Sequence, residues 1–460
     1  MSGLNATLNI ALSALATSQQ ALETTSNNVA NANTPGYSRQ RAVLEPGAPI
    51  TLGPLTFGTG VVLDKIESLR DPILEIQLNQ ETQTQSRLDS ELTQLQQIQT
   101  QFSSASSGIG ADITNFFNSL QQLAPDPANL ALRQAVLTSA GNLATDFNTA
   151  AINLNAQRAN LNQTVTQDVG EVNTLTAAIA SVNQQISYLQ NVHQDASSLI
   201  DQQTSLIRQL SGLIDVAVIP TDQGISLTTS NGTALVSGNQ SFNLSTQLAS
   251  DGMQHIYAGT NDITSTLAGG SLAGTIQIRD QQIPGILGQL DQLAAGLTTA
   301  LNTANAQGFD LNGNQGGNLF VPPPAGGTGA AAAMHVAITD PALIAASSDG
   351  TPGSNGNLAV LSAVHDQEVV NGQTPLGYYS NVVFQIGSTT SNTSAESDAS
   401  SQILKQLQDE RGSVSGVSLD EEAASMIQYQ SAYQAAARVV STVNSLLADA
   451  VNLGLDTPVQ

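Results

Sequence analysis

The residue types that most often carry catalysis or bind metals are few in this chain and far apart. The four histidines, His193, His255, His335 and His365, stand in dissimilar contexts, and the chain contains no cysteine. The sequence holds no His-Glu-x-x-His pair, no nucleophile elbow and no phosphate-binding glycine loop. We therefore predict no catalytic residue, no resident cofactor and no thiolate metal site, and we expect the histidines to be solvated or half-packed.

One segment, which starts at Asp310-Leu-Asn312-Gly-Asn314, begins like the oxygen-rich loop that binds calcium. The sixth position of such a loop is Gln315 here instead of glycine, and the twelfth is Val321 instead of glutamate. The sharp turn and the bidentate carboxylate of that loop are therefore missing. We interpret the segment as a polar turn and predict no metal site.

The composition of the chain excludes several kinds of partner. Asp and Glu number 36 against 12 Lys and Arg, which gives a net charge of −24. An acidic chain repels phosphate backbones and anionic lipid, so we expect neither nucleic-acid nor membrane binding. No Lys or Arg precedes Arg39, so the basic start of a cleaved secretory signal is missing. Hydrophobic residues make up 40% but aromatic residues only 3%, which favours closely packed long helices over one large globular core.

The start of the chain has heptad spacing, which is typical of helices that pair. No Pro or Gly and a single charge, Glu23, occur between Leu4 and Val29. Two lines of residues recur there every seven positions, one of large apolar residues and one of small or polar residues: Leu8, Leu15, Leu22 and Val29, then Leu4, Ala11, Ser18 and Thr25. A turn should follow, made by Asn31, Asn33, Pro35, Gly36 and Tyr37.

The end of the chain repeats this spacing. A capping box, Ser418-Leu-Asp-Glu421, predicts the start of a helix, and Gly454 its end. The apolar line of this helix consists of Leu419, Met426, Tyr433, Val440 and Leu447. Its second line consists of Ala423, Gln430, Ala437, Asn444 and Val451. We predict that the two terminal helices pair with each other. The alternative is that each packs on the middle of the chain.

The middle of the chain reads as helical with a β insertion. Helices are expected over about 72–103, 113–123, 129–139, 142–192, 197–214, 274–306 and 374–411, and extended chain over 42–66. Asn231-Gly232 predicts a hairpin turn within short β-type runs. The fold class is therefore mainly α: an elongated helical rod with paired N- and C-terminal coiled-coil helices and a small inserted β element. The predicted domains are a terminal assembly domain (1–60 and 413–460), a helical rod (61–215, 276–308 and 355–412), the β element (216–275) and a loop-rich insertion (309–354).

Both ends also resemble a known family. The run Asn27-Asn-Val-Ala-Asn-Ala-Asn-Thr-Pro-Gly-Tyr-Ser-Arg-Gln40 is similar to the N-terminal signature of the flagellar axial family, which holds rod, hook and hook-associated proteins. Val417-Ser-Leu-Asp-Glu-Glu-Ala, with the Tyr-Gln pairs at Tyr429 and Tyr433, resembles the C-terminal signature of hook-associated members. The likeness covers 1–41 and 415–453, and the middle agrees in pattern. Longer members carry an outer β domain where this chain has the loop-rich insertion.

The resemblance implies a structural component of the bacterial flagellum, secreted by the type III route. It would leave the cytoplasm and form the junction between hook and filament. The implied partners are a ring of copies of itself, the hook protein, the next hook-associated junction protein, and a cytoplasmic export chaperone at the C-terminal helix. The apolar heptad lines and the turn at 31–37 would form the assembly interface. The alternatives are another axial protein, such as hook or distal rod, or a soluble binding protein or enzyme with a site in 216–350.

Overall fold

The computed structural model describes all residues except 1, 53–54, 103–106, 193, 222–223 and 456–460, so that His193 lies outside the described residues. The chain is mainly helical with a few small sheets, as predicted. It forms two compact units, each built from stretches that are distant in sequence. Unit 1 comprises Met1–Thr82, Val172–Asn243 and Gln402–Gln460, and unit 2 comprises Gln83–Glu171 and Leu244–Ser401.

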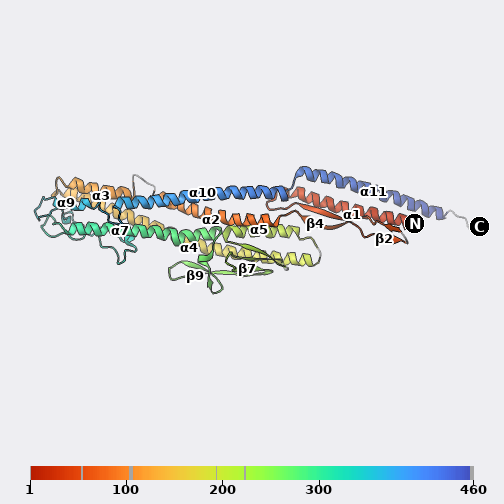
Figure 1. Cartoon of the computed structure of the whole chain (residues 1–460), viewed down its shortest axis with the longest axis horizontal. Helices are drawn as coiled ribbons and strands as arrows, with labels where there is room; N and C mark the ends of the chain where they lie inside the picture. Colours follow the sequence, from red (N-terminus) through yellow and green to blue (C-terminus); the bar gives the residue numbers. More distant parts are fainter. Residues whose placement is uncertain (1, 53–54, 103–106, 193, 222–223, 456–460) are drawn as a thin grey trace, which may run out of the picture. The chain divides into compact units, whose positions relative to one another are not determined.

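In unit 1 the two ends of the chain lie together. Helix α1 (Ser2–Ala30) packs along α11 (Leu419–Leu455), which confirms the predicted pairing of the terminal helices (Figure 1). Strands β1 (Gln40–Pro46) and β4 (Val61–Ser68) pair antiparallel and also pack on α1. The hydroxyls of Ser13 and Thr17 donate to the carbonyl oxygen of Val61 on β4. Helix α1 therefore has both a helical and a β partner.

The extended segment after the turn includes a second hairpin. Strands β2 (Ile50–Leu52) and β3 (Leu55–Phe57), which lie between β1 and β4 in the sequence, pair antiparallel as a separate two-stranded sheet. The helix α2 (Pro72–Phe102) then starts where the sequence predicted. One oxygen of Asp71 accepts the backbone N–H of Ile73 at 2.9 Å and of Leu74 at 3.3 Å, which is the expected N-terminal cap.

The remainder of unit 1 is a helix-backed sheet. Helix α5 (Ser197–Leu213) is followed by an antiparallel sheet in the order β5-β6-β7-β8. Asn183 of α4 (Leu130–Asn191) donates to the carbonyl of Ile225 on β6 and to that of Gly238 in the turn between β7 and β8. The predicted Asn231-Gly232 turn is confirmed, because it joins β6 to β7 with Gly232 at φ 87°. The strands are β5 (Ala217–Thr221), β6 (Gly224–Thr228), β7 (Ala234–Ser237) and β8 (Gln240–Ser241).

Two helices are longer than predicted. The expected separate helix at 129–139 is wrong, since α4 continues through Gly141 without a break. The helix predicted over 374–411 was expected to end near Arg411, which is also wrong, because α10 (Pro375–Ser415) continues through Gly412. A glycine inside a helix costs about 1 kcal/mol, which packing elsewhere along a long helix offsets. Three residues close to Gly141 in the sequence are buried, namely Ala140, Leu143 and Ala144.

Unit 2 is a bundle of helices around an aromatic centre. Phe116 packs edge-on against Phe117 and Phe320, with ring centroids 5.3 and 6.2 Å apart. Its elements, besides parts of α2, α4 and α10, are α3 (Ile109–Leu123), β9 (Leu244–Leu248), β10 (Gln254–Ala258), β11 (Asn261–Asp262), η1 (Thr264–Thr266), α6 (Gly270–Gln277), the π turn η2 (Ile278–Gln282), α7 (Ile283–Ala306), α8 (Ala330–Ala333), η3 (Pro341–Leu343) and α9 (Gly356–Ala363).

The loop-rich stretch 309–354 contributes to the core of unit 2. Leu319, Phe320 and Ile344 are completely buried in its hydrophobic cluster. Arg133, which is also buried, donates from Nε to the carbonyl of Pro127 at 2.5 Å and from Nη1 to that of Ile344 at 2.6 Å. These contacts fix the loops against α4 even though long helices and strands are lacking there.

Candidate assembly interface

The predicted apolar line of α1 lies along the edge of the helix pair. Leu8, Leu15 and Leu22 are half-buried, and Val29 is 37% exposed. The buried positions of α1 are small or polar instead: Ala11, Thr17, Ser18, Ala21, Thr24, Thr25 and Asn28. Small side chains at a helix contact let the backbones approach closely. Three of these residues come from the small line that the sequence predicted.

The apolar line of α11 changes its environment along the helix. Leu419 is 56% exposed and Tyr433 38% exposed, whereas Met426, Val440 and Leu447 are half-buried. Glu422, Ala436 and Val443 occupy the buried face. Further apolar residues are exposed on α11, namely Ile427, Val439, Leu446 and Val451.

The predicted turn after α1 folds back onto the end of that helix. The side chain of Asn31 donates to the carbonyl of Asn27 at 3.0 Å, while Asn33 and Pro35 are exposed. Gly36 adopts φ 85°, a backbone region that favours glycine, and its carbonyl accepts a hydrogen bond from Arg411 at 3.0 Å. The structure thus brings the turn to the C-terminal end of α10.

At this turn the two chain ends are joined by a largely buried polar group, of which the sequence analysis had singled out Tyr37 alone as an interface residue. We call Asn28, Tyr37, Arg39, Gln40 and Glu422 the end latch. The amide nitrogen of Asn28 donates to the carbonyl of Gln40 at 2.8 Å and to a carboxylate oxygen of Glu422 at 3.0 Å. Its oxygen accepts the Tyr37 hydroxyl at 2.8 Å and the Gln40 N–H at 2.9 Å. The Asn28 side chain is buried, and this set of partners satisfies its full hydrogen-bonding capacity.

Arg39 supplies the charged part of the end latch. Its Nε lies 2.6 Å from Oε1 of Glu422, and its Nη1 lies 2.5 Å from Oε2 of Glu421. Burial lowers the pKa of Arg39, but the hydrogen bonds and charges of the two glutamates outweigh this effect, so the pKa is raised overall. The backbone N–H of Arg39 also donates to the carbonyl of Ser415 at 2.9 Å. The sequence offered one hint, the acidic first turn of the last helix, whose charges also suit the helix dipole.

A second cluster of ions connects the turn to the helices of unit 1. The carboxylate of Glu75 on α2 lies 2.7 Å from Arg208 on α5 and 2.5 Å from Arg411 on α10. Asp201 on α5 accepts from Arg70 at 2.8 Å and from the N–H of Ser38 at 3.3 Å.

This environment changes the acidity of the Tyr37 phenol. Burial, followed by the negative charges of Asp201, Glu422 and Asp195, raises the pKa of Tyr37 to about 12. The phenol therefore stays a hydrogen-bond donor to Asn28 at neutral pH. The turn, the end latch and the ion cluster form one continuous polar connection within unit 1.

The residues that first suggested chemistry are engaged in local structure. One oxygen of Asp310 accepts the N–H groups of Asn312 and Asn314, as in the polar turn preferred from the sequence. His255 bridges two carboxylates, that of Asp262 on β11 at 2.6 Å and that of Asp251 in the preceding turn at 3.2 Å. Within the described ranges no group of three or more His, Asp or Glu side chains is placed so that it could hold a metal ion. A helix of the length and apolarity needed to cross a membrane is likewise missing from the described part of the chain.

Comparison with known families assigns this arrangement to a class. Residues 95–320 match the flagellar hook-associated protein FlgK helical domain, residues 8–37 match the flagella basal body rod protein family, and residues 411–453 match the C-terminal family of the basal body rod FlgEFG proteins. The chain therefore belongs to the flagellar rod and hook axial protein family, and it is a structural component of the bacterial flagellum. The two terminal matches contain most of the end latch.

Within this family the chain is similar to flagellar hook-associated protein 1 over nearly its whole length. It is 27% identical to that protein of Escherichia coli K12 over 98% of this chain and 100% of the relative. It is 29% identical to that of Bacillus subtilis 168 over 97% of each chain. The fold is similar to the flagellar hook junction protein FlgK from Burkholderia pseudomallei, with a TM-score of 0.67 and 20% identity over 74% of this chain and 100% of that chain. These findings agree with the hook-associated role that the terminal signatures implied.

Proposed function

We propose that this chain forms the junction between hook and filament as a ring of copies at the tip of the hook. The observation that supports this most strongly is the end latch, which joins the N-terminal axial signature to the C-terminal one through buried polar groups. The shared name of the relatives, and the hook-junction role named for the Burkholderia protein, support the same position in the flagellum. In this proposal 1–60 and 413–460 form the assembly domain, and the rest forms a rod with its β and loop insertions.

The terminal helices supply the contacts with neighbouring copies. The seam of α1 consists mostly of small or polar residues, which contribute little hydrophobic stabilisation. Large apolar residues of α11, including Leu419, Ile427 and Leu446, are exposed. Isolated helices with this balance are marginal in water. We infer that the ends become fully ordered when neighbours cover these exposed flanks.

The specific partners follow from this position. The ring would present one surface to the hook protein and another to the next hook-associated protein. A cytoplasmic export chaperone would cover the apolar flanks of α11 before type III export, and the assembled chain would be extracellular. The chain has no cysteine, so unfolding for export needs no disulfide reduction. The role needs no cofactor and no catalytic residue, and loss of the ring would abolish motility.

Immuno-electron microscopy of flagella tests the proposal directly. Label against this chain should be confined to the boundary between hook and filament, and a variant lacking residues 4–29 should be exported without appearing there. Label distributed along the hook or along the rod would instead favour another axial position. A strain that swims normally without the chain would contradict a structural role at the junction.

A further inference from the structure

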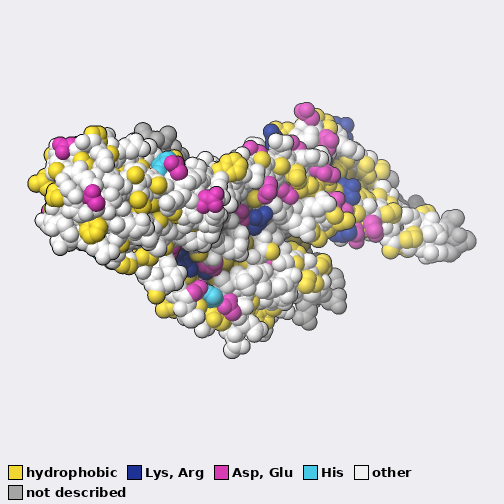
Figure 2. All heavy atoms as spheres, turned by 60° about the vertical axis from the view of Figure 1, so that its left-hand side comes forward, with side chains coloured by type: hydrophobic (Ala, Val, Ile, Leu, Met, Phe, Trp, Pro, Cys, Tyr) yellow, Lys and Arg dark blue, Asp and Glu magenta, His cyan; other side chains and the backbone are white. Residues whose placement is uncertain are grey.

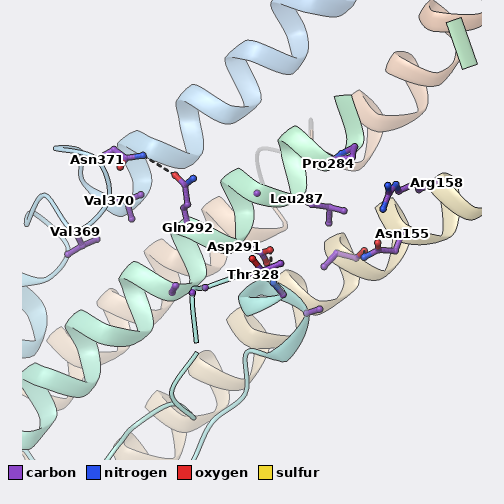
Figure 3. A pocket seen from close by; sticks show the side chains of 17 residues that line it. Asn155, Arg158, Pro284, Leu287, Asp291, Gln292, Thr328, Val369, Val370 and Asn371 are labelled. Atoms are coloured by element: carbon purple, nitrogen blue, oxygen red, sulfur yellow. Dashed lines mark hydrogen bonds between the residues drawn. The ribbon is translucent and has the colours of Figure 1, made fainter. Parts of the chain in front are cut away.

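Unit 2 contains a cavity that the terminal helices do not form. Its volume is about 760 Å³, and it is lined by α4, α7, the glycine-rich loop before α8 and residues 369–371. Figure 3 shows Asn155 and Arg158 on α4 across from Leu287 and Asp291 on α7. Its volume lies in the range of pockets that hold a small ligand or several side chains. We call it the Arg158 pocket.

The walls of the Arg158 pocket are held in place by internal hydrogen bonds. Asp291 accepts the N–H groups of Gly329 at 2.7 Å and Ala331 at 2.9 Å, which fixes the glycine-rich loop to α7. The oxygen of Gln292 accepts from Asn371 at 2.9 Å, as Figure 3 shows, and from the hydroxyl of Tyr378 at 3.0 Å. The shape of the pocket is therefore built by its own contacts.

These bonds leave several donors of the pocket unused and engage two of its acceptors. The carboxylate of Asp291 and the oxygen of Gln292 each have two donors already. Arg158 donates from Nε to the carbonyl of Arg279 at 3.1 Å, and its two terminal nitrogens have no hydrogen-bond partner among the described residues. The Gln292 amide nitrogen and the Thr328 hydroxyl also lack a partner among those residues. The pocket is therefore suited to a ligand that accepts hydrogen bonds and carries negative charge.

Arg158 differs in this respect from the other arginines of unit 2. Arg87 is paired with Glu91, Arg279 with Asp280, and Arg133 donates to backbone carbonyls. Asp251 interacts with Arg158 electrostatically but forms no ion pair with it within the described structure. Figure 2 shows Asp and Glu spread over the visible face, with Lys and Arg in few places. A second copy of this chain, which carries a net charge of −24, would therefore bring many carboxylates and few competing cations.

We propose that the Arg158 pocket receives an Asp or Glu side chain from a second copy of this chain in the assembled ring. The small residues of its walls, such as Ala151, Gly288 and Ala295, leave room for the residues that flank this carboxylate. The inference rests on the proposed function, because the ring brings copies together at high effective concentration. It adds a contact between copies that does not involve the terminal helices.

Photo-crosslinking within isolated flagella tests this contact. The full chain carries Thr328→p-benzoylphenylalanine in the pocket, and the control carries the same group at Thr299, an exposed position of α7 outside the pocket. Irradiation should give a covalent dimer from the pocket variant, and the linked peptide should come from this chain and contain Asp or Glu. A link to a different protein would overturn the proposal. The proposal would also be overturned if the chain were present in the flagella but gave no crosslink. Absence of the chain from the flagella would overturn the proposed function and this inference together.

Charge variants identify the role of Arg158 itself. In the chain that carries the crosslinking group at Thr328, Arg158→Gln should remove most of the covalent dimer. Lys405→Gln changes the net charge equally at an exposed site on α10 and should leave the dimer. Arg158→Lys keeps the charge but cannot donate from Nε to Arg279, so it should retain the dimer. Equal yields from the two Gln variants would overturn the electrostatic contact. Loss of the dimer in both Arg158 variants would reassign Arg158 to holding the pocket wall.

Discussion

The substitution Glu422→Ala examines the end latch where it is most buried. It removes one partner from Arg39 and one acceptor from Asn28, although Arg39 keeps Glu421 and Asn28 keeps the Gln40 carbonyl. Removing one member of a buried ion pair costs about 3–5 kcal/mol. Since the Arg39 side chain is 23% exposed and can be partly rehydrated, we expect the lower end of that range, about 3 kcal/mol. The loss should appear in the local opening of the α1–α11 pair.

Glu421→Ala is the matched control, because it removes a carboxylate from the same arginine at a position that is 63% exposed. Exposed pairs contribute about 0.2–1 kcal/mol. Hydrogen exchange of the α1 amides at 24–30 should therefore accelerate by about a hundredfold in the Glu422 variant and by only a few-fold in the control. Equal exchange in the two variants would refute the end latch. A matching acceleration in α3 would show that the effect is not local.

Four further predictions concern the terminal helices and two titrating groups. Deleting residues 4–29 should leave a folded monomer that cannot assemble, and a loss of most of the helical circular dichroism would contradict this. Val440→Asp should reduce swimming of a null strain more than Gln430→Asp at equal export, because Val440 is half-buried and Gln430 exposed. The hydrogen bond to Asp262 raises the pKa of His255. The stabilisation that protonated His255 gives the folded state should therefore be complete below about pH 6 and should be lost as the pH rises through the raised pKa. Urea unfolding of His255→Gln and of the unmodified chain across this pH range measures the difference. In absorbance titrations, the unmodified chain should show one phenol that titrates near the raised pKa of about 12 instead of 10, and Tyr37→Phe should lack this phenol.

The features that sequence analysis predicted correctly are those encoded by neighbouring residues. Asp71 followed by proline defined the start of α2, and Asn231-Gly232 defined a hairpin turn. The pairing of the terminal helices followed from heptad spacing at both ends. The continuity of α4 through Gly141 could not be predicted, because a glycine signals a break locally and tertiary packing overrides that signal.

The end latch could not be derived from local patterns. Asn28 and Glu422 are separated by 394 positions, and each looks like an ordinary polar residue at a helix end. Their burial depends on the turn at Gly36 and on the ends of α10 and α11 meeting at one place. The polar run at 27–40 resembles a family signature, but its physical role emerges only from the hydrogen-bond partners of each atom. The Arg158 pocket is similar, since its residues come from separate helices and loops.

The structure separates the groups that specify how the chain ends pair from the groups that can stabilise an assembly. The end latch uses polar contacts with strict geometry, and the seam beside it consists mostly of small or polar side chains. Leu419, Ile427 and Tyr433, by contrast, remain exposed, and full burial of one such side chain contributes about 1.5–3 kcal/mol. Latch substitutions should therefore loosen α1 in the single chain. Polar substitutions on the exposed flank, such as Ile427→Gln, should leave hydrogen exchange of the single chain unchanged but weaken assembly. If Ile427→Gln loosened the single chain as much as Glu422→Ala does, the division between pairing within a chain and stabilisation between copies would be wrong.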